Sequence, residues 1–332
     1  MVVAYDILVN NKDVRKEGTI LKKSTVVEQS IIYTSLDEDK KALFKQEYGI
    51  DIDSDLFDPR LDFVSKRILT AETKESKKAL ISFLNATLKL KGKKKIVKVL
   101  NPVTTVDSEK QKKSVFDVRV EFRDGSEAII EIEFRKKDNF KKRSQFLISR
   151  SYSSQDLAGK TYDDLKKRYI ICVLNYTLLD DDEDGDDFRR EYMWRDTKGR
   201  MLTDDQTIII VELTKIDGLL EKPVNKLTPL EQWVIFFRYA TDQSKRELLN
   251  KIIEREEGIK MAAQILENIS MDKQERIAYE EQLIYELDQR SEVASARKQA
   301  AREIAKGLKL DSIPFNIIIK NTGLTLQEVE AL

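Results

Sequence analysis

The sequence predicts an α/β fold, and three observations favour it. Residues 114–134 alternate between apolar and polar side chains, as expected of strands with one buried face. Residues 169–178 and 207–213 form short, mostly apolar runs that are typical of buried strands. From residue 228 onward the sequence predicts helices, including a long Ala- and charge-rich one at 277–310, so a helical region is expected to follow the strands.

The remaining elements follow from the same periodicities. We expect helices at 37–48, 75–90 and 277–310, a helix that ends at Gly159, and strands at 96–102, 169–178, 188–196 and 207–213. We divide the chain into an N-terminal extension of unknown role (1–54), an α/β domain (55–220) and a helical C-terminal region (221–332).

Composition excludes several kinds of chemistry. The 332 residues contain no His and one Cys, Cys172, which we expect to be buried and inert. Serine–histidine catalysis, zinc sites of Cys/His type and internal disulfides are therefore excluded. Any catalytic metal would need hard oxygen ligands, which favours Mg²⁺ or Mn²⁺.

Charge and hydropathy point to a protein that acts without a membrane. Lys and Arg together number 59, as do Asp and Glu, so no global field attracts nucleic acid. No apolar run approaches the roughly 18 residues of a membrane span, and the N-terminus lacks the order of a signal peptide. We expect a cytoplasmic location and no membrane partner.

Residues 114–134 are expected to form a hairpin whose even-numbered residues share an apolar face. A three-residue loop, 124–126, with Gly125 or its neighbour left-handed, keeps even residues opposite even ones. That register places Asp117 opposite Glu133, with Glu131 one step away on the same polar face. Two interpretations stay open, a solvated surface strand and a strand that holds a metal ion.

Further segments carry a resemblance to a known family. They are DPRLDFVSKRIL (58–69), ALISFLNATLKL (79–90), LNP (100–102), the hairpin, 140–176, ENISMDKQERIAYEEQL (267–283) and NTGLTLQEVEAL (321–332). In this order they resemble the Rpn recombination-promoting nucleases, also described as PD-(D/E)XK nuclease family transposases. The resemblance implies a restriction-endonuclease-like core, with a mixed sheet flanked by helices, and a DNA substrate.

The resemblance also implies a site. Asp117 and Glu131 would bind Mg²⁺ or Mn²⁺, with the Ile132 carbonyl as a third ligand, and Glu133 would activate water or bind a second metal. The family usually has Gln or Lys where Glu133 stands, so this position departs from the pattern. Glu75 would face the metal through water, although an acid at a helix N-terminus is also favoured by the helix dipole.

Basic and polar residues after the hairpin are candidate DNA contacts. Lys141 and Lys142 belong to a basic cluster, with Arg135, Lys136, Lys137 and Arg143, that directly follows the acidic strand. Arg143, Tyr152 and Gln155 match family positions, and we interpret Arg143 as a phosphate contact and Gln155 as a polar group lining the site. An exposed helix face explains these residues equally well.

The C-terminal residues 313–332 predict two helices joined by a turn at 321–323, with a capping box formed by Thr325 and Glu328. We expect this hairpin to serve self-association, giving a homo-oligomer, or partner docking. A helix-turn-helix that reads DNA is a less favoured alternative, because no basic recognition face is present. Three functional hypotheses follow: a metal-dependent DNA endonuclease, a degenerate nuclease that binds DNA or protein without cutting, and, less favoured, a helical assembly protein.

Overall fold

The computed structural model describes residues 38–89, 96–99, 118–133, 136–137, 139–178 and 187–332, which belong to one compact unit, residues 36–332. Three helices come first, namely α2 (Glu38–Tyr48), α3 (Asp62–Thr70) and α4 (Lys74–Leu88). The α/β part then contains β1 (Ile96–Val99), β2 (Val118–Phe122), β3 (Glu127–Glu133), α5 (Phe140–Ser153), β4 (Arg168–Leu174), β5 (Arg189–Arg195) and β6 (Met201–Glu212). The C-terminal helices are α6 (Pro229–Tyr239), α7 (Arg246–Arg255), α8 (Glu257–Met271), α9 (Lys273–Leu310), α10 (Phe315–Thr322) and α11 (Leu326–Glu330).

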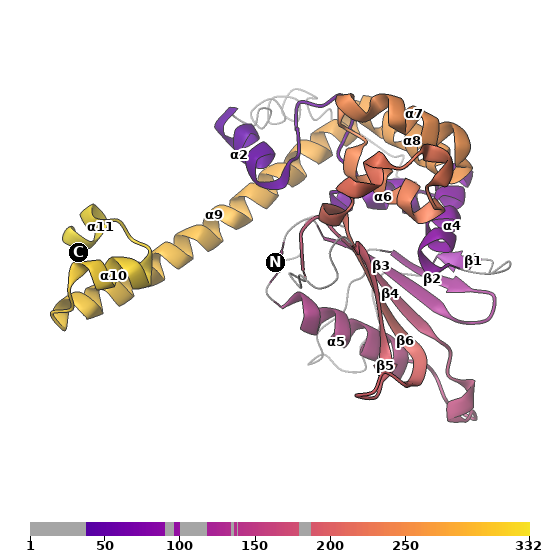
Figure 1. Cartoon of the computed structure of the whole chain (residues 1–332), viewed down its shortest axis with the longest axis horizontal. Coiled ribbons are helices and arrows are strands. Elements are labelled where there is room, and N and C mark those ends of the chain that lie inside the picture. Colours follow the sequence, from indigo (N-terminus) through magenta and orange to yellow (C-terminus); the bar gives the residue numbers. More distant parts are fainter. Residues whose placement is uncertain (1–37, 90–95, 100–117, 134–135, 138, 179–186) are drawn as a thin grey trace, which may run out of the picture. The chain divides into compact units, whose positions relative to one another are not determined.

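The strands form a six-stranded mixed sheet in the order β1-β2-β3-β4-β6-β5 (Figure 1). β3, β4 and β6 are parallel, and β1, β2 and β5 pair antiparallel with their neighbours. α5 connects β3 to its parallel neighbour β4, as a crossover helix must. The expected α/β fold with a mixed sheet flanked by helices is confirmed.

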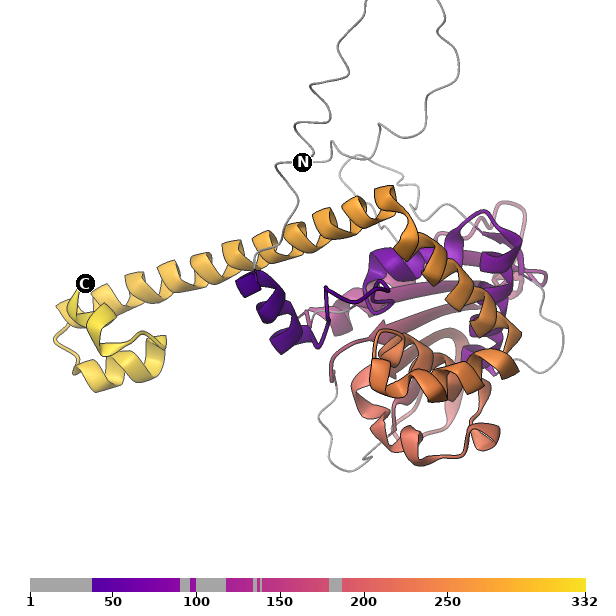
Figure 2. The same ribbon diagram turned by 90° about the horizontal axis from the view of Figure 1, so that it is seen from above.

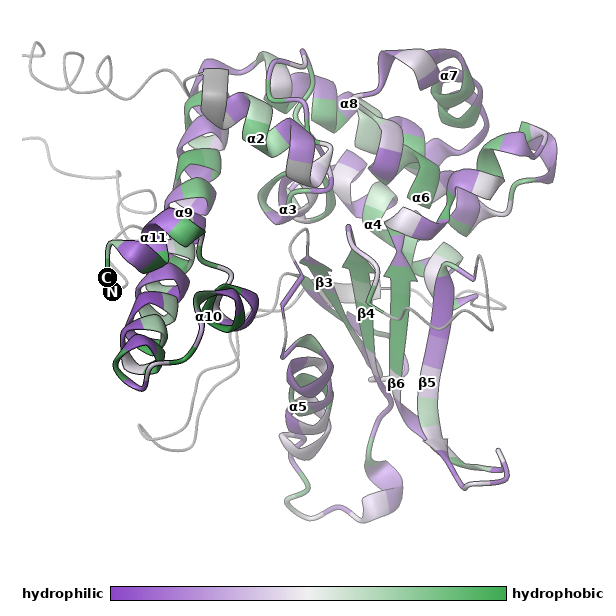
Figure 3. Ribbon diagram, turned by 60° about the vertical axis from the view of Figure 1, so that its left-hand side comes forward, coloured by the Kyte–Doolittle hydropathy of each residue, from purple (hydrophilic) through white to green (hydrophobic). Residues whose placement is uncertain are grey.

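The two faces of the sheet pack against different helices. Even residues of β2 and β3, such as Val120 and Ile130, join one large core with buried residues of α3, α4, α6, α8 and α9. Ile129, on the opposite face, packs with Leu147 and Ile148 of α5. The hydrophobic colouring along β4 and along the second half of β6 in Figure 3 fits strands that are covered on both sides there.

The hairpin keeps the predicted parity but not the predicted register. Val118 pairs with Ile130 and Glu121 with Glu127, so even residues do face even ones. The loop, however, consists of residues 123–125 and not 124–126, with Gly125 at φ +78° and its N–H donating to the carbonyl of Phe122 over 2.9 Å. The register is therefore shifted by two residues from the predicted one. Asp117 lies outside the described residues.

Of the two interpretations left open for this hairpin, a solvated surface strand does not hold for β3. Glu131 and Glu133 are only 2% and 7% exposed. The reason is α5, whose apolar residues lie against the same face around Ile129. The odd-numbered side of β3 is thus a second core with carboxylates in it, and buried carboxylates need partners.

A single core extends across the predicted domain boundaries. It includes Phe44 and Ile50 from before residue 55, and Trp233 and Leu283 from after residue 220. The division into 1–54, 55–220 and 221–332 stays a prediction, which folding of separate fragments would test. Because the segments share one core, we expect residues 55–220 alone to fold poorly.

The C-terminal helices confirm the predicted helical hairpin. α10 ends at Gly323, which has φ +70°, and Thr325 with Glu328 forms the capping box at the start of α11. Figure 2 shows α10 and α11 beside the last turns of α9. Ala305, Ile318, Leu324 and Val329 bury their side chains there in a small separate core. Whether this hairpin mediates self-association stays a prediction.

Candidate active site

The candidate site is built on the last residues of β3. Glu131 and Glu133 stand two residues apart on a strand, so their side chains point to the same face. Both carboxylates meet the guanidinium of Arg143 on α5, which reaches Glu131 over 2.8 Å and Glu133 over 2.9 Å. Lys137 adds a second cation, with its ammonium 2.5 Å from the other oxygen of Glu133.

Local chain geometry explains why Arg143 reaches both acids. α5 begins seven residues after Glu133 and returns along the same sheet face, so its first turns lie over the end of β3. The planar guanidinium presents nitrogens at fixed spacing and uses a different one for each glutamate. One side chain thereby neutralises much of the repulsion between two buried like charges.

Tyr176, just beyond β4, lies near Glu133 and Arg143 of this cluster. Its ring packs edge-on against Phe140 at 6.3 Å. Burial, followed by the carboxylate of Glu133, raises the pKa of the Tyr176 hydroxyl, so this group stays neutral at physiological pH. Glu133 therefore lies in a mixed environment of two cations and one neutral aromatic side chain.

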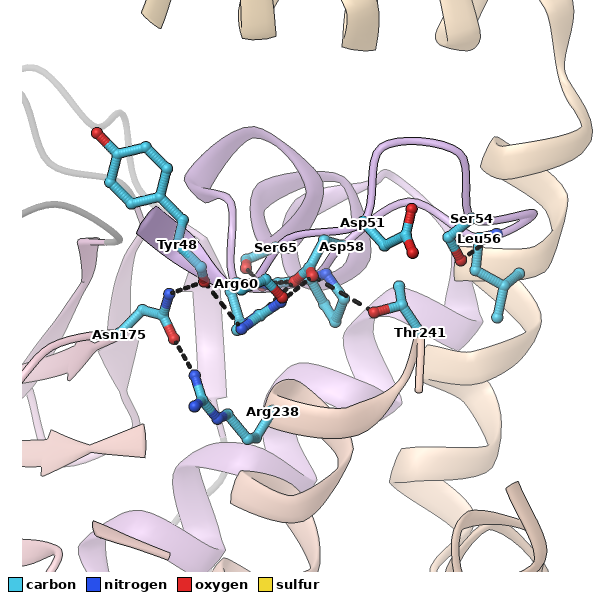
Figure 4. Close-up of polar contacts among 12 residues, drawn as sticks. Tyr48, Asp51, Ser54, Leu56, Asp58, Arg60, Ser65, Asn175, Arg238 and Thr241 are labelled. Carbon is cyan, nitrogen blue, oxygen red and sulfur yellow. Dashed lines mark hydrogen bonds and ion pairs between the residues drawn. The ribbon is translucent and has the colours of Figure 1, made fainter. Parts of the chain in front are cut away.

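A partly buried polar network holds the adjoining strand ends in place (Figure 4). The backbone N–H of Asn175 donates to the carbonyl of Glu133 over 3.0 Å. Its side-chain oxygen accepts from Arg238 of α6 over 2.8 Å, and its amide nitrogen donates to the carbonyl of Tyr48 over 3.4 Å. The same carbonyl accepts a bond from Arg60, so three distant segments converge beside Glu133.

Arg60 and Asp58 form the buried centre of that network. Their side chains are 4% and 1% exposed and share two hydrogen bonds, of 2.9 and 2.5 Å. Burial lowers the pKa of Arg60, but the carboxylate of Asp58 outweighs it, and the net shift is upward. Thr241 also donates to Asp58 over 3.4 Å. The segment 58–60 thus connects the chain before α3 to the helical layer.

The other predicted residues are distributed as follows. Near the start of β4, the side-chain amide of Gln155 donates to the carbonyl of Lys166 over 2.9 Å, and its oxygen accepts from the N–H of Lys166 over 2.8 Å. Glu131 pairs with Cys172, which lies four residues along β4 from Arg168, the first residue of that strand. Gln155 bonds a residue just before Arg168, so it lies about 13 Å or more along the strand from Glu131. Tyr152 is within 3.4 Å of Asp205, on β6.

Lys141 and Lys142 are exposed on the first turns of α5, beside Arg143. Glu75 is exposed in the first turn of α4, whose packing partners are α8, α3 and α6, which agrees with a helix N-terminal acid. The structure therefore brings Glu131, Glu133 and Arg143 together, with Ile132 between the two acids, and leaves Gln155 and Glu75 outside this cluster.

Sequence reasoning missed Lys137, Tyr176, Asn175 and Arg238. In the sequence, Lys137 is one member of a basic run. Its spacing of four residues from Glu133 would have suggested an ion pair only if the intervening residues were helical. Nothing local in the sequence identifies Asn175 or Arg238, because their contact joins residues 63 positions apart.

The donor set suits a hard divalent cation in part. Carboxylate oxygens are the ligands that Mg²⁺ and Mn²⁺ prefer, and the cations of Arg143 and Lys137 already lie against the oxygens of these two acids. Within the described residues, no three acidic, His or Cys side chains are grouped closely enough to hold a metal ion. Asp117, the third predicted ligand, lies outside that part of the chain.

Comparison with known proteins decides the family. A family model described as PD-(D/E)XK nuclease family transposase matches residues 59–296, well over half of the chain. The chain belongs to this family. The match ends before 321–332, so the resemblance suggested for that segment is not part of it. No curated protein and no solved structure matches the chain significantly.

Membership in the PD-(D/E)XK family indicates a nuclease, and nucleases of this kind generally use divalent metal ions and act on DNA. In the part of the chain that the structure describes, no helix is long and apolar enough to cross a lipid bilayer.

Proposed function

We propose that the protein is a metal-dependent DNA endonuclease that hydrolyses phosphodiester bonds. The observation that carries the proposal is the pair Glu131 and Glu133, buried on one face of β3 and joined by Arg143, in a chain of the PD-(D/E)XK family. Fixed carboxylates can hold a divalent metal against a scissile phosphate, and neighbouring cations can stabilise the charge that develops on it. The proposed location is the cytoplasm.

Each residue of the cluster has a proposed role. Glu131, with Asp117 and the Ile132 carbonyl, would hold Mg²⁺ or Mn²⁺, which supplies Lewis-acid stabilisation of the charge that develops on the scissile phosphate. Glu133 would accept a proton from the attacking water. Lys137 and Arg143 would bind phosphate oxygens when DNA is present, and Lys141 and Lys142 would contact the backbone further away. Gln155 and Glu75 retain at most an auxiliary role.

The proposal is tested by Glu131→Gln, which keeps the size of the side chain and removes its charge. We expect this variant to lose cutting of supercoiled plasmid in Mg²⁺ or Mn²⁺ while binding DNA in EDTA with an affinity close to that of the wild type. Glu191→Gln is the matched control, because Glu191 is an exposed strand glutamate on β5. Unchanged cutting by the Glu131 variant would refute the proposed role.

A degenerate nuclease that binds DNA or protein without cutting is the second candidate. One observation favours it: among the described residues, cationic side chains already contact both glutamates. A wild-type protein that binds DNA yet cuts no supercoiled, linear or single-stranded substrate in Mg²⁺ or Mn²⁺ would establish this alternative.

A further inference from the structure

A groove runs between α5 and the β5–β6 ribbon, on the flank of α5 that faces away from β3. It has a volume of about 700 Å³. One wall is made by Lys142, Gln145, Phe146 and Ser149, which follow one side of α5 at helical spacing. The other wall includes Tyr192 and Trp194 of β5. Tyr192 pairs with Ile208 of β6, which packs toward α5, so the Tyr192 ring shares that face.

Aromatic side chains are unusually exposed in this groove. Phe146 is 50% exposed, Tyr192 43% and Trp194 56%. The other tryptophan of the chain, Trp233, is 0% exposed in the main core. Scattered exposed apolar residues are ordinary, but three aromatic rings from two elements facing one groove indicate a binding surface.

The charge of the groove is positive. Lys142 and Arg195 line it, and none of the described residues that line it is acidic. The Arg195 guanidinium donates to the carbonyl of Gly199 over 2.9 Å, which holds it on the ribbon. A second groove, near Gln155, differs in this respect, because its Arg119 and Arg168 are already paired with Glu127. Of these two grooves, as far as the described residues show, the first offers cations without competing acids.

The groove also lies close to the candidate active site along the chain. Lys142, at one end of the groove, is the neighbour of Arg143, which holds Glu131 and Glu133. Across the sheet, β5 lies three strand spacings, or about 14 Å, from β3, and Tyr192 is level with Ile129, two residues from Glu131. A chain of nucleotides lying in the groove could therefore continue past the first turns of α5 to the glutamates.

We propose that this groove binds an unpaired, single-stranded stretch of nucleic acid, with bases stacked on Trp194, Tyr192 and Phe146 and phosphates on Lys142 and Arg195. The proposal rests on the proposed function, and it specifies the substrate: DNA with an unpaired segment next to the cleaved bond. Unpaired bases expose their faces to aromatic rings, whereas paired bases are stacked inside a duplex. A positive groove walled by aromatic residues matches a single strand in both charge and surface.

Binding can be measured apart from cutting, with the full chain in EDTA. The probes are an oligothymidylate of roughly 12 nucleotides, within the usual site sizes of single-strand binding proteins, and a duplex of the same length. Stacking of a base on Trp194 should quench its fluorescence. Trp194→Phe should remove this quenching, because the remaining Trp233 is buried. Fluorescence anisotropy gives the affinity.

Trp194→Ala should weaken single-strand binding roughly 5- to 150-fold, the range expected for one lost base–aromatic stack. Lys142→Ala should make the negative slope of log K against log salt less steep by about 0.7, as for one lost phosphate contact on a single strand. Tyr285→Ala is the matched control, since Tyr285 on α9 is also 56% exposed, and it should bind like the wild type.

The outcomes separate this proposal from the proposed function. Binding that Trp194→Ala leaves unchanged, or a clear preference for the duplex, overturns the groove proposal whether or not the protein cuts DNA. Wild-type dimers that become monomers on Trp194→Ala would also overturn it, because the groove would then bind a second copy of the chain. Single-strand binding that depends on Trp194, in a protein that cuts nothing, supports the groove and refutes the endonuclease.

Discussion

Removing the positive charge of Arg143 should destabilise the protein, and a divalent cation should restore part of the loss. Arg143→Met keeps most of the side-chain stem and leaves Glu131 and Glu133 buried without their shared partner. Breaking a fully buried ion pair costs about 3–5 kcal/mol. Because Arg143 is 31% exposed and Lys137 remains, we expect about 2–3 kcal/mol here.

The corresponding shift in melting temperature is measurable. A chain of this size loses about 2 °C per kcal/mol, so thermal unfolding should show a decrease of about 4–6 °C. If the two glutamates help to bind a divalent cation, Mg²⁺ or Mn²⁺ at 10 to 100 times its Kd should stabilise the variant by about 1.4–2.7 kcal/mol. The variant should also bind the metal more tightly than the wild type, in which Arg143 competes for the same oxygens.

Arg168→Met is the matched control. Arg168 is a buried arginine paired with Glu127 at the other end of the same face of β3, over 3.2 Å. Glu127 keeps Arg119 as a second partner, so this variant should also be destabilised but should gain nothing specific from metal. An equal metal response in both variants, or an Arg143 variant as stable as the wild type, would refute the reasoning.

Three further predictions concern other parts of the chain. Gly258→Ala should lower the free energy of unfolding by about 1–3 kcal/mol, because the new methyl group would collide with a serine of α4. Gly307→Ala, in open space on α9, should leave it unchanged or raise it. Urea unfolding measures both changes, and a change of the same sign in both variants would contradict this reasoning. A hydrogen bond from Lys298, with others from the capping box, lowers the pKa of Glu328 from 4.5 to about 2. Its contribution to stability is present above pH 4.5 and lost as the pH falls toward 2, so NMR should show α11 loosening in that range, and Glu328→Gln should flatten the change. Glu133→Gln and Glu133→Lys should lower cutting by about 10²–10⁴-fold if this carboxylate is the base, whereas faster cutting by either would identify the natural protein as a weakened nuclease.

The sequence predicted the faces of the hairpin well and its register poorly. Alternation settles which residues share a face, because a one-residue slip would have buried the charged residues of β2, Arg119 and Glu121, against the main core. A two-residue slip leaves every residue on its own face, so alternation cannot detect it. The loops 123–125 and 124–126 are equally long and both contain Gly125. Which of them forms depends on contacts with the rest of the sheet.

The environment of the acids could not be predicted from the hairpin alone. Burial of Glu131 and Glu133 results from α5, which follows β3 in sequence but covers it only because β4 returns parallel to β3. The role of Arg143 follows from the same crossover. A pattern confined to the hairpin shows two acids on one face, whereas the structure shows those acids in a second core with their own cations.

The net charge of the cluster around Glu131 and Glu133 affects how it would bind metal and DNA. Within the described residues, two carboxylates face two cations, Arg143 and Lys137, so the cluster is close to neutral. Binding of a divalent cation without any other change would leave an excess of positive charge in a buried site, which is costly. A phosphate group brings negative charge and good acceptors for a guanidinium.

Arg143 would then exchange its glutamate partners for the phosphate, and metal and DNA should bind cooperatively. Both interpretations of Arg143, counterion in the free protein and phosphate contact in the complex, are therefore consistent. Arg143→Met should weaken this cooperativity while strengthening the binding of metal alone.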